Sequence, residues 1–363
     1  MNILIDIGHP AHVHLFKNAI FKFKEDGNNV TITIKDNSVI KDLLDALKLD
    51  YIILGSKGKG IILKIIKQVG FSFKALGLIR KYKTDLAIGV SISIAHACLF
   101  SKAKAIVFDD DDISATPIFA ALSHRFANHV VSPEVLKKER RRNKDVFYAG
   151  YHELAYLHPN IFKPNEDILK ETGICKGDNF SIVRFSAMEA HHDINEQGIS
   201  NKQAIQIIEL LERKGKVFIT SEKPLPEDLQ KYQLSLSLDK FHDFLSFASI
   251  LVCDSQTVAS EAAVLGVPSV RINTFVGRIS YLNELEKKYE LTFGFLPNDF
   301  ENALNKIKTL FNQKDRHLIF QKRRKKMLTE KIDLTAFIVW LIENYPKSVD
   351  IMKSNPDYQY KFN

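Results

Sequence analysis

Residues 240–273 read KFHDFLSFASILVCDSQTVASEAAVLGVPSVRIN, and this stretch indicates one unit of a parallel α/β fold. The apolar run 250–253 predicts a buried strand, and a polar turn after it leads into a helix at 257–265. Gly266 ends that helix, and a second apolar strand is expected at 269–272. Strand, helix and strand in this order form a βαβ unit, whose strands are parallel and whose crossover is right-handed.

The same alternation of short apolar strands and longer helices runs through most of the chain. In the first half, strands are expected at 2–7, 30–34, 51–54, 85–90, 105–108 and 129–132. The helices between them are expected at 14–25, 38–47, 61–82, 94–101 and 117–128. In the second half, further strands are expected at 180–185 and 217–220, and further helices at 202–214, 241–248 and 333–345. Helices of this length between strands predict parallel sheets.

The length of 363 residues is typical of two domains. The pattern restarts after 148–164, a stretch rich in Tyr, His, Pro and Asn that we interpret as the interdomain linker. We therefore expect an amino-terminal Rossmann-like domain at 1–155 and a carboxyl-terminal one at 165–332, followed by a last helix and tail at 333–363. The predicted fold class is α/β, with two doubly wound domains facing each other across a cleft.

Composition narrows the class of protein further. Apolar residues make up 45% of the chain and charged residues 26%, which excludes intrinsic disorder and collagen-like or coiled-coil repeats. The net charge of +8 suits an anionic partner, whether a nucleotide, a nucleic acid or a membrane surface. Three widely spaced cysteines argue against a disulfide scaffold. Because no secretory signal or membrane span is visible, we expect a cytoplasmic protein that can touch a membrane from that side.

The polar turn at Asp254, Ser255, Gln256 and Thr257 is the first candidate binding site. It lies at the carboxyl end of a predicted parallel strand and at a helix N-terminus, where backbone N–H groups and the helix dipole favour a phosphate. Glu261 follows about one turn later, and an ionised carboxylate can accept both hydroxyls of a ribose. The alternative is that Asp254 or Ser255 only caps the helix and that Glu261 is a solvated charge.

The string D-S-x-x-x-x-S-E-A-A-x-L-G-x-P at 254–268 resembles the carboxyl-domain signature of GT-B-fold glycosyltransferases. It is more similar still to UDP-N-acetylglucosamine 2-epimerases, which carry D-S-G-G-x-x-E-E-A-x-x-L-G-x-P. The sequence departs from that pattern, because Gln256 and Thr257 replace the two glycines and Ser260 replaces the first glutamate. Over most of its length the chain resembles a GT-B family of unknown function in prokaryotes that is related to these epimerases.

The resemblance implies a role for each matching residue. Ser255, Gln256 and Thr257 would face the pyrophosphate of a nucleotide-sugar, and Glu261 its ribose. The preceding K-F-H-D-F-L-S-F-A-S resembles the element that holds the base in glycosyltransferases, which points to Phe241 and His242. The carboxyl-terminal domain would then bind the nucleotide-sugar and the amino-terminal domain the acceptor, with the last helix packing back across the seam between them.

The loop Gly8-His9-Pro10-Ala11-His12 joins the first predicted strand to the first helix, at the edge of the sheet where ligands bind in doubly wound domains. Gly8 permits close approach of the backbone, and His9 and His12 present two imidazoles. Histidine suits general-base chemistry on an acceptor hydroxyl, for which we favour His9. The alternative is that one of these rings caps the helix or packs under it. We expect His14 to belong to the helix.

Four carboxylates, 109–112, follow the predicted strand at 105–108. A metal site is conceivable, but consecutive side chains diverge and the GT-B resemblance argues against an obligatory metal. We therefore expect neither a metal nor a cofactor beyond the sugar nucleotide. Since the related epimerases carry an acidic residue at this strand end, we favour Asp110 as acceptor binder or base. The other three are expected to cap the next helix and to lie in solvent.

Basic residues form a second group of candidates. Arg184 ends the strand at 180–185 and could neutralise a diphosphate leaving group, or else form a salt bridge at the sheet edge. Weaker candidates for the same cleft are Arg271 and Arg278, and His191 is a candidate substrate contact.

Between Ser56 and Thr84 no acidic residue occurs, and lysines and arginines alternate with apolar residues. Such a basic amphipathic segment can lie on anionic lipid, although an ordinary solvated outer helix is an equal alternative. Two shorter basic clusters, 140–142 and 323–326, are equally ambiguous. Nucleic acid binding ranks low, because no recognition helix or stacking aromatics are visible.

These observations predict a metal-independent GT-B glycosyltransferase that uses a nucleotide-diphosphate sugar for polysaccharide biosynthesis, and we expect the donor to be UDP-linked. The acceptor would be a cell-surface glycan or a lipid-linked molecule, and His9 or Asp110 would be the general base. One alternative is a UDP-N-acetylglucosamine 2-epimerase-like enzyme. A second alternative is a non-catalytic nucleotide-sugar-binding protein.

Overall fold

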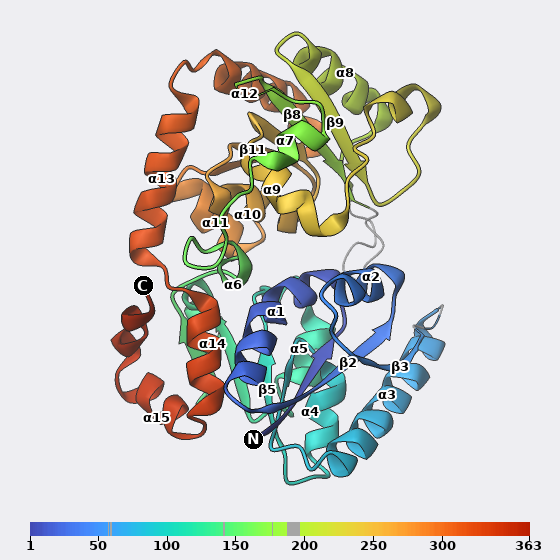
Figure 1. Ribbon diagram of the computed structural model, residues 1–363, viewed down its shortest axis with the longest axis vertical. Helices are drawn as coiled ribbons and strands as arrows, with labels where there is room; N and C mark the ends of the chain where they lie inside the picture. The colour runs from blue at the N-terminus through green and yellow to red at the C-terminus, as the bar shows by residue number, and fades with distance from the viewer. Residues whose placement is uncertain (57, 59, 141, 176, 187–196) are drawn as a thin grey trace. The chain divides into compact units, whose positions relative to one another are not determined.

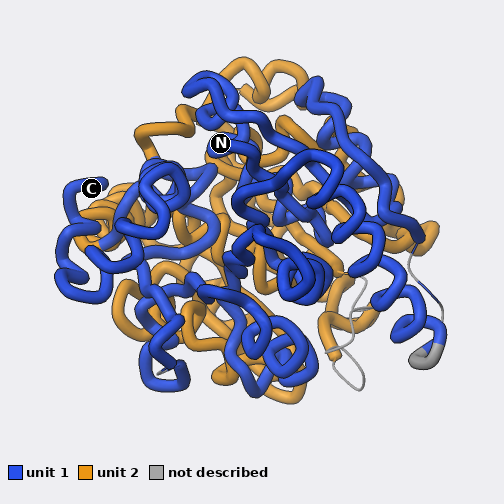
Figure 2. Tube along the Cα trace, turned by 90° about the horizontal axis from the view of Figure 1, so that it is seen from below, with its two compact units in different colours: residues 1–158, 331–363 blue, residues 159–330 orange. Residues whose placement is uncertain are grey.

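The computed structural model describes residues 1–363 with the exception of 57, 59, 141, 176 and 187–196. The chain divides into two compact units. Unit 1 consists of residues 1–158 and 331–363, and unit 2 consists of residues 159–330 (Figure 2). The chain therefore leaves unit 1 once and returns to it near its end.

Unit 1 is built on a seven-stranded sheet in the order β3-β2-β1-β4-β5-β6-β7, and all neighbouring strands are parallel (Figure 1). The strands are β1 (Asn2–Ile7), β2 (Asn29–Asp36), β3 (Ile52–Ser56), β4 (Leu86–Gly89), β5 (Lys104–Phe108), β6 (His129–Pro133) and β7 (Asp145–Tyr148). The chain order reverses direction between β1 and β4, which is the switch point where ligands bind in doubly wound sheets. Gly89 (φ +154°) makes this pairing possible, because a Cβ there would lie 2.5 Å from the carbonyl oxygen of Asp6.

The helices of unit 1 cover both faces of the sheet. They are α1 (Pro10–Glu25), α2 (Ser38–Ala46), α3 (Ile61–Lys81), α4 (Ile92–Cys98), α5 (Pro117–Ser123), α6 (Leu154–Leu157), α14 (Leu334–Glu343) and α15 (Lys347–Ser354), with 3₁₀ turns η1 (Glu134–Lys138) and η5 (Pro356–Phe362). Right-handed crossovers place α1 and α2 on one face and α3, α4 and α5 on the other, since the strand order reverses after β3. Contacts agree, because α3 packs on α4 and α4 on α5, whereas α1 packs on α2, α6 and α14.

Unit 2 contains a five-stranded parallel sheet in the order β12-β11-β10-β8-β9. Its strands are β8 (Phe180–Phe185), β9 (Lys216–Ser221), β10 (Ile250–Cys253), β11 (Ser269–Ile272) and β12 (Thr292–Phe295). Its helices are α7 (Asp167–Glu171), α8 (Asn201–Glu212), α9 (Phe241–Ser246), α10 (Gln256–Leu265), α11 (Ser280–Lys287), α12 (Phe300–Asn312) and α13 (Arg316–Glu330), with 3₁₀ turns η2 (Glu227–Tyr232), η3 (Leu238–Lys240) and η4 (Pro297–Asp299). The switch point lies between β8 and β10.

The stretch 148–164 differs from the linker expected there. Its first part belongs to unit 1, where β7 ends the sheet and α6 is buried against α1. The returning carboxyl-terminal segment fixes it in place: Thr335 donates to the carbonyl of Ala155 at 2.6 Å, and Gln359 accepts from the amide of Ala149 at 2.6 Å. The linker interpretation is therefore wrong for residues 148–158, which contain the last residue of β7 and the buried helix α6.

Two further differences concern single elements. The first helix begins at Pro10 rather than residue 14, because His9 caps it and proline fits a first helical position. The fifth helix ends at Ser123 rather than residue 128. Among the helices of the described residues, none combines the length and the apolar composition that crossing a bilayer requires.

Candidate functional site

Asp254 lies at the switch point of unit 2, directly after β10, and ties neighbouring strand ends together. Its carboxylate accepts the amide of Ser186 at 2.7 Å and, more weakly, that of Ile199 at 3.4 Å. Its carbonyl accepts the side-chain amide of Asn273 at 2.8 Å. Burial raises the pKa of Asp254, and the backbone amides oppose that rise. Both carboxylate oxygens of Asp254 are therefore hydrogen-bonded to backbone amides, those of Ser186 and Ile199, although sequence reasoning offered Asp254 as a ligand contact.

The next residues form the N-terminus of α10. The hydroxyl of Ser255 caps the helix by accepting the amide of Val258 at 3.3 Å, as the structural alternative proposed. Gln256 and Thr257 are the first two helical residues and are partly exposed. Helix geometry gives their amides no intrahelical acceptor, so these two residues form the end of α10 that is suited to an anion.

Glu261 and His242 meet in unit 2, although each was singled out from the sequence on separate grounds. The Oε1 atom of Glu261 lies 3.0 Å from Nε2 of His242. Glu261 is 4% exposed and His242 5%, and the ring of Phe162 lies edge-on to His242. Glu261 is therefore not a solvated charge, and that alternative is excluded. Phe241 stands beside His242 with ring centroids 5.9 Å apart and remains half-buried.

Arg184 forms a salt bridge at the sheet edge, 2.6 Å from Glu222. Cys253 pairs in register with Arg184 on one side and with Arg271 on the other, so the three side chains leave the same face of the sheet. Arg271 does not line an open site, because it is fully buried and burial lowers its pKa. Arg278 lies over the ring of Phe275 at 5.0 Å.

His191, the remaining candidate of unit 2, lies outside the described residues.

The loop after β1 places Gly8, His9 and His12 together at the carboxyl edge of the sheet in unit 1. Nδ1 of His9 accepts the amide of Ala11 at 3.2 Å, and Nδ1 of His12 accepts the amide of Gly8 at 3.3 Å. These bonds fix the neutral rings in the tautomer that carries its proton on Nε2. A Cβ at Gly8 would meet only the ring of His12, at 3.9 Å, so no neighbouring protein group requires glycine there.

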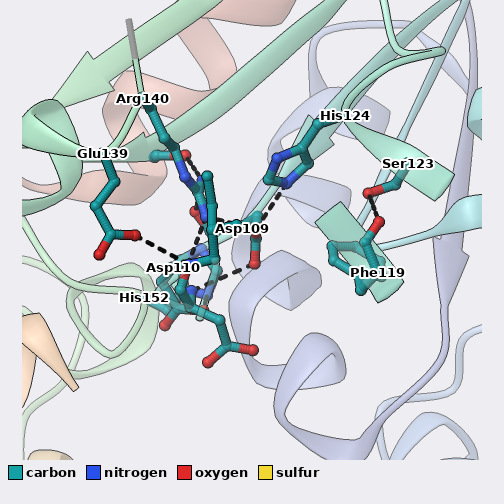
Figure 3. A network of polar contacts seen from close by, with 11 residues as sticks. Asp109, Asp110, Phe119, Ser123, His124, Glu139, Arg140 and His152 are labelled. Atoms are coloured by element: carbon teal, nitrogen blue, oxygen red, sulfur yellow. Dashed lines mark hydrogen bonds and ion pairs between the residues drawn. The ribbon is translucent and has the colours of Figure 1, made fainter. Parts of the chain in front are cut away.

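Asp109 starts the acidic run after β5 and is buried in a network of polar contacts (Figure 3). Nη2 of Arg140 lies 2.6 Å from its carboxylate and Nε2 of His124 lies 2.7 Å from it. Arg140 also donates to the carbonyl of Asp109 at 2.8 Å and to Ser132 and the carbonyl of Asp111.

This network corrects two expectations. Asp109 and Asp112 do not lie in solvent, since both are buried, and no aspartate side chain caps α5, whose N-cap is Thr116. Arg140 is not part of a surface cluster, because it neutralises Asp109 at 3% exposure.

Asp110 and Asp111 are partly exposed beside this network, and their environments differ. Oδ1 of Asp110 lies 3.1 Å from Nδ1 of His152. Burial opposes ionisation of Asp110, but His152 outweighs it and holds the pKa of Asp110 below its usual range. Burial would lower the pKa of His152, yet Asp110 raises it overall. Burial and the charges of Asp110 and Asp109 raise the pKa of Asp111 well above its usual range. Neighbouring carboxyls with oppositely shifted pKa values are a feature of acid–base sites.

Sequence reasoning missed His152, Asp111 and the Arg140 contact. His152 follows the end of β7, so recognising that strand would have placed it at the carboxyl edge of the sheet. Within the part of the chain that the structure describes, no three His, Cys, Asp or Glu side chains are grouped to hold a metal ion. The expectation of a metal-independent protein stays a prediction.

Comparison with known proteins shows to which family the chain belongs. It belongs to the family described as "Protein of unknown function (DUF354)", which matches residues 1–347. It is similar to "Uncharacterized protein MJ0665" of Methanocaldococcus jannaschii, at 22% identity over 325 residues that cover 85% of this chain and 91% of that protein.

Two solved structures show the fold. A UDP-GlcNAc 2-epimerase from Neisseria meningitidis bound to UDP-GlcNAc matches with a TM-score of 0.66 at 12% identity, over 95% of this chain and all (100%) of that one. The spinosyn rhamnosyltransferase SpnG, complexed with spinosyn aglycone, matches with a TM-score of 0.63 at 12% identity, over 95% of this chain and 100% of that one. The expected GT-B-like class with two Rossmann-like, parallel-sheet units is confirmed.

Proposed function

We propose that this DUF354 protein is a glycosyltransferase that takes a nucleotide-diphosphate sugar, UDP-linked by preference, and passes the sugar to a hydroxyl of a glycan or lipid-linked acceptor. One observation carries the proposal: the buried pair of His242 and Glu261, which lies on α9 and α10 beside the end of α10 that is suited to an anion. The fold supports it, because an epimerase bound to UDP-GlcNAc and a rhamnosyltransferase share that fold.

In this proposal, unit 2 holds the donor. The amides of Gln256 and Thr257 and the positive end of α10 bind the diphosphate. Glu261 accepts hydrogen bonds from the ribose hydroxyls, because an ionised carboxylate is a pure acceptor with about four lone-pair sites. His242 thus positions Glu261. Phe241 is the aromatic side chain that lies beside the nucleotide base in this proposal.

Unit 1 supplies the acid–base groups. The acceptor oxygen attacks the anomeric carbon, the bond from that carbon to the diphosphate oxygen breaks, and the acceptor proton passes to a protein base. Asp111 suits this step, because its raised pKa makes the ionised carboxylate a better proton acceptor. Asp110, our choice from the sequence, is held ionised by His152 and supplies fixed negative charge beside it. His9, also chosen from the sequence, lies at the same carboxyl edge of the sheet in unit 1 and is the second candidate to contact the acceptor.

Binding of UDP tests the donor site directly. Glu261→Gln keeps an acceptor for His242 but loses the charge, and we expect it to weaken UDP binding by roughly 10- to 100-fold, since a hydrogen bond to a charged group contributes about 1.5–3 kcal/mol. The matched control is Glu209→Gln on an exposed position of α8, which should bind UDP like the wild type.

The ribose contact can be isolated by a second ligand. We expect 2′-deoxy-UDP to bind the wild type more weakly than UDP, and Glu261→Gln to bind both ligands alike, because the two changes remove the same interaction. If Glu261→Gln binds UDP as tightly as the wild type, the pocket assignment is wrong. If UDP binds but no acceptor is ever glycosylated, the protein is a non-catalytic nucleotide-sugar binder.

A second candidate, nucleotide-sugar 2-epimerisation, is favoured by the opposite pKa shifts of Asp110 and Asp111. Epimerisation needs one group to remove the proton at the second carbon of the sugar and another to return it on the opposite face. Incubation with UDP-N-acetylglucosamine alone in heavy water separates the candidates. Formation of the manno isomer with deuterium at the second carbon supports the epimerase, and an unchanged substrate that reacts only with an acceptor supports the transferase.

A further inference from the structure

Helices α3, α4 and α5 form the layer that covers one face of the sheet in unit 1, and their sequences contain no Asp or Glu. The neighbouring chain is almost as poor in acids, since Asp85 is the sole acidic residue between Ser56 and Phe108. The carboxylate of Asp85 forms a hydrogen bond within unit 1, where it accepts from the amide of Asn2 at 2.7 Å. This layer therefore carries a positive charge without acidic residues to balance it.

The outer side of α3 is apolar, which is unusual for a helix at a protein surface. Successive helical residues are turned by about 100°, so Ile65, Ile66, Val69 and Phe73 fall on one side of α3. These four side chains are 59%, 60%, 50% and 68% exposed. The opposite side is apolar as well, but Ala75 and its neighbours pack into the core beneath α4. In Figure 1, α3 forms the outer margin of unit 1 beyond α4.

The apolar surface continues along the same layer. Phe100 is 67% exposed just after α4, and its carbonyl accepts from Arg80 of α3 at 3.0 Å, which places it beside the end of that helix. Ile118 on α5 is 69% exposed. Basic side chains on and between these elements are at least partly exposed: Lys64, Lys67, Lys74, Arg80, Lys81, Lys83, Lys102 and Lys104.

We infer that this layer is a docking surface for an anionic phospholipid bilayer. Large apolar side chains in the centre and lysines around them match the acyl boundary and the anionic headgroups of a bilayer. A second copy of the chain does not match, because a symmetric contact would set lysines against lysines with no acid in the layer to pair with them. Nucleic acid offers phosphates but no partner for the outermost isoleucines and phenylalanine. The inference does not rest on the proposed activity, since bilayer binding is measured without any nucleotide.

Vesicle flotation of the full chain tests the inference. We expect the protein to float with vesicles that contain about one third phosphatidylglycerol and not with pure phosphatidylcholine, and to be released by salt. Ile65→Ser/Ile66→Ser/Phe73→Ser should lower the apparent affinity at least tenfold. Lys81→Gln/Lys102→Gln, at two exposed lysines near Phe100, should lower it by roughly 30-fold at low salt, since each lysine near an anionic surface contributes about 1 kcal/mol, or about fivefold.

Ile205→Ser on α8 of unit 2 is the matched control, because Ile205 is also exposed, at 43%, on a helix that carries glutamates. It should leave vesicle binding unchanged. A spectroscopic variant, Phe73→Trp, keeps the surface apolar, and its emission should shift to shorter wavelength when anionic vesicles are added. An unaltered thermal unfolding transition shows that each variant is folded.

Three results would overturn the inference. The wild type could fail to float with anionic vesicles, or the triple serine variant could bind them as well as the wild type. The third is a concentration-dependent dimer that the triple variant abolishes while no vesicle binding is seen, which would identify a second copy as the partner of this surface.

Discussion

Replacing Arg140 by methionine should destabilise unit 1 through the carboxylate of Asp109. Arg140 is the buried cation that neutralises Asp109, at 2.6 Å, and it also donates to the carbonyl of Asp109 at 2.8 Å. Methionine fills part of the same volume but carries no charge and no donor. Asp109, 1% exposed, then retains the ring of His124 at 2.7 Å and the amide of Asp111 at 3.3 Å.

The size of the effect follows from the cost of an uncompensated buried charge. Removing one partner of a buried ion pair costs about 3–5 kcal/mol. Because Asp109 retains two contacts, we expect the lower end, about 3 kcal/mol. For a unit of this size 1 kcal/mol shifts the midpoint by about 2–4 °C, so the transition should move down by about 6–12 °C.

Trp340 makes the measurement selective for unit 1. It is the sole tryptophan of the chain and lies on α14, which belongs to unit 1. Urea or thermal unfolding followed by its fluorescence therefore reports the unit that holds Arg140. The matched control is Arg142→Met, at an exposed arginine two residues away, which should change the free energy of unfolding by less than about 0.5 kcal/mol.

The double variant Asp109→Leu/Arg140→Met tests the cause. This double variant removes the uncompensated carboxylate of Asp109, so it should be more stable than Arg140→Met alone. The reasoning fails if Arg140→Met lowers the free energy of unfolding by no more than Arg142→Met does. It also fails if the double variant is the less stable of the two, since the loss would then come from packing rather than charge.

Three further predictions concern other parts of the molecule. Burial raises the pKa of Cys98 and of Cys253 to about 12, so a thiol reagent at about pH 8 should label only exposed Cys175 in the native protein, and Cys175→Ser should abolish native labelling. Gly266→Ala should destabilise unit 2 by about 1–2 kcal/mol, measured by calorimetry, because φ is +75° and a Cβ would lie 2.7 Å from the side-chain amide of Gln321. His152→Gln should cost most stability below about pH 6.5, and the deficit should shrink as pH rises above that value, because the gain from the raised pKa of His152 is full below the unfolded pKa of about 6.5 and is lost as the folded ring gives up its proton. A deficit that grows with pH would contradict the assignment.

Most strands could be predicted from the sequence because buried parallel strands are runs of apolar residues whose neighbours are polar turns. The strands β7 and β12 were not predicted, because β7 has only three apolar residues after its opening aspartate and a glycine interrupts β12. In β12, Gly294 weakens the strand pattern, yet a Cβ there would lie 2.9 Å from a methyl group of Val276. Glycine at this position is therefore favoured by packing against a segment elsewhere in the chain, and the local sequence does not reveal that contact.

The sequence predicted where several candidate residues lie in the fold, but it did not predict which side chains they contact. Parallel topology brings strand ends to one edge, which placed Asp110, His9 and Ser255 just after the carboxyl ends of their strands. Partners that come from far along the chain were not predictable: Asp109 is neutralised by Arg140, 31 residues later, and Asp110 is paired with His152. Which of four consecutive aspartates is buried, paired or open to substrate depends on those partners.

The motif at 254–268 divides in the structure into residues that build the fold and residues with groups to offer a ligand. Asp254 ties strand ends together, Ser255 caps α10, and Gly266 supplies the left-handed turn after it. Pro268 accepts the amide of Leu251 where β10 and β11 begin. These architectural residues would persist in a relative that binds no nucleotide. Within the motif, Gln256, Thr257 and Glu261 are therefore the residues that can contact a ligand. Measuring UDP affinity in variants of these three residues is a more specific test of function than the presence of the whole motif.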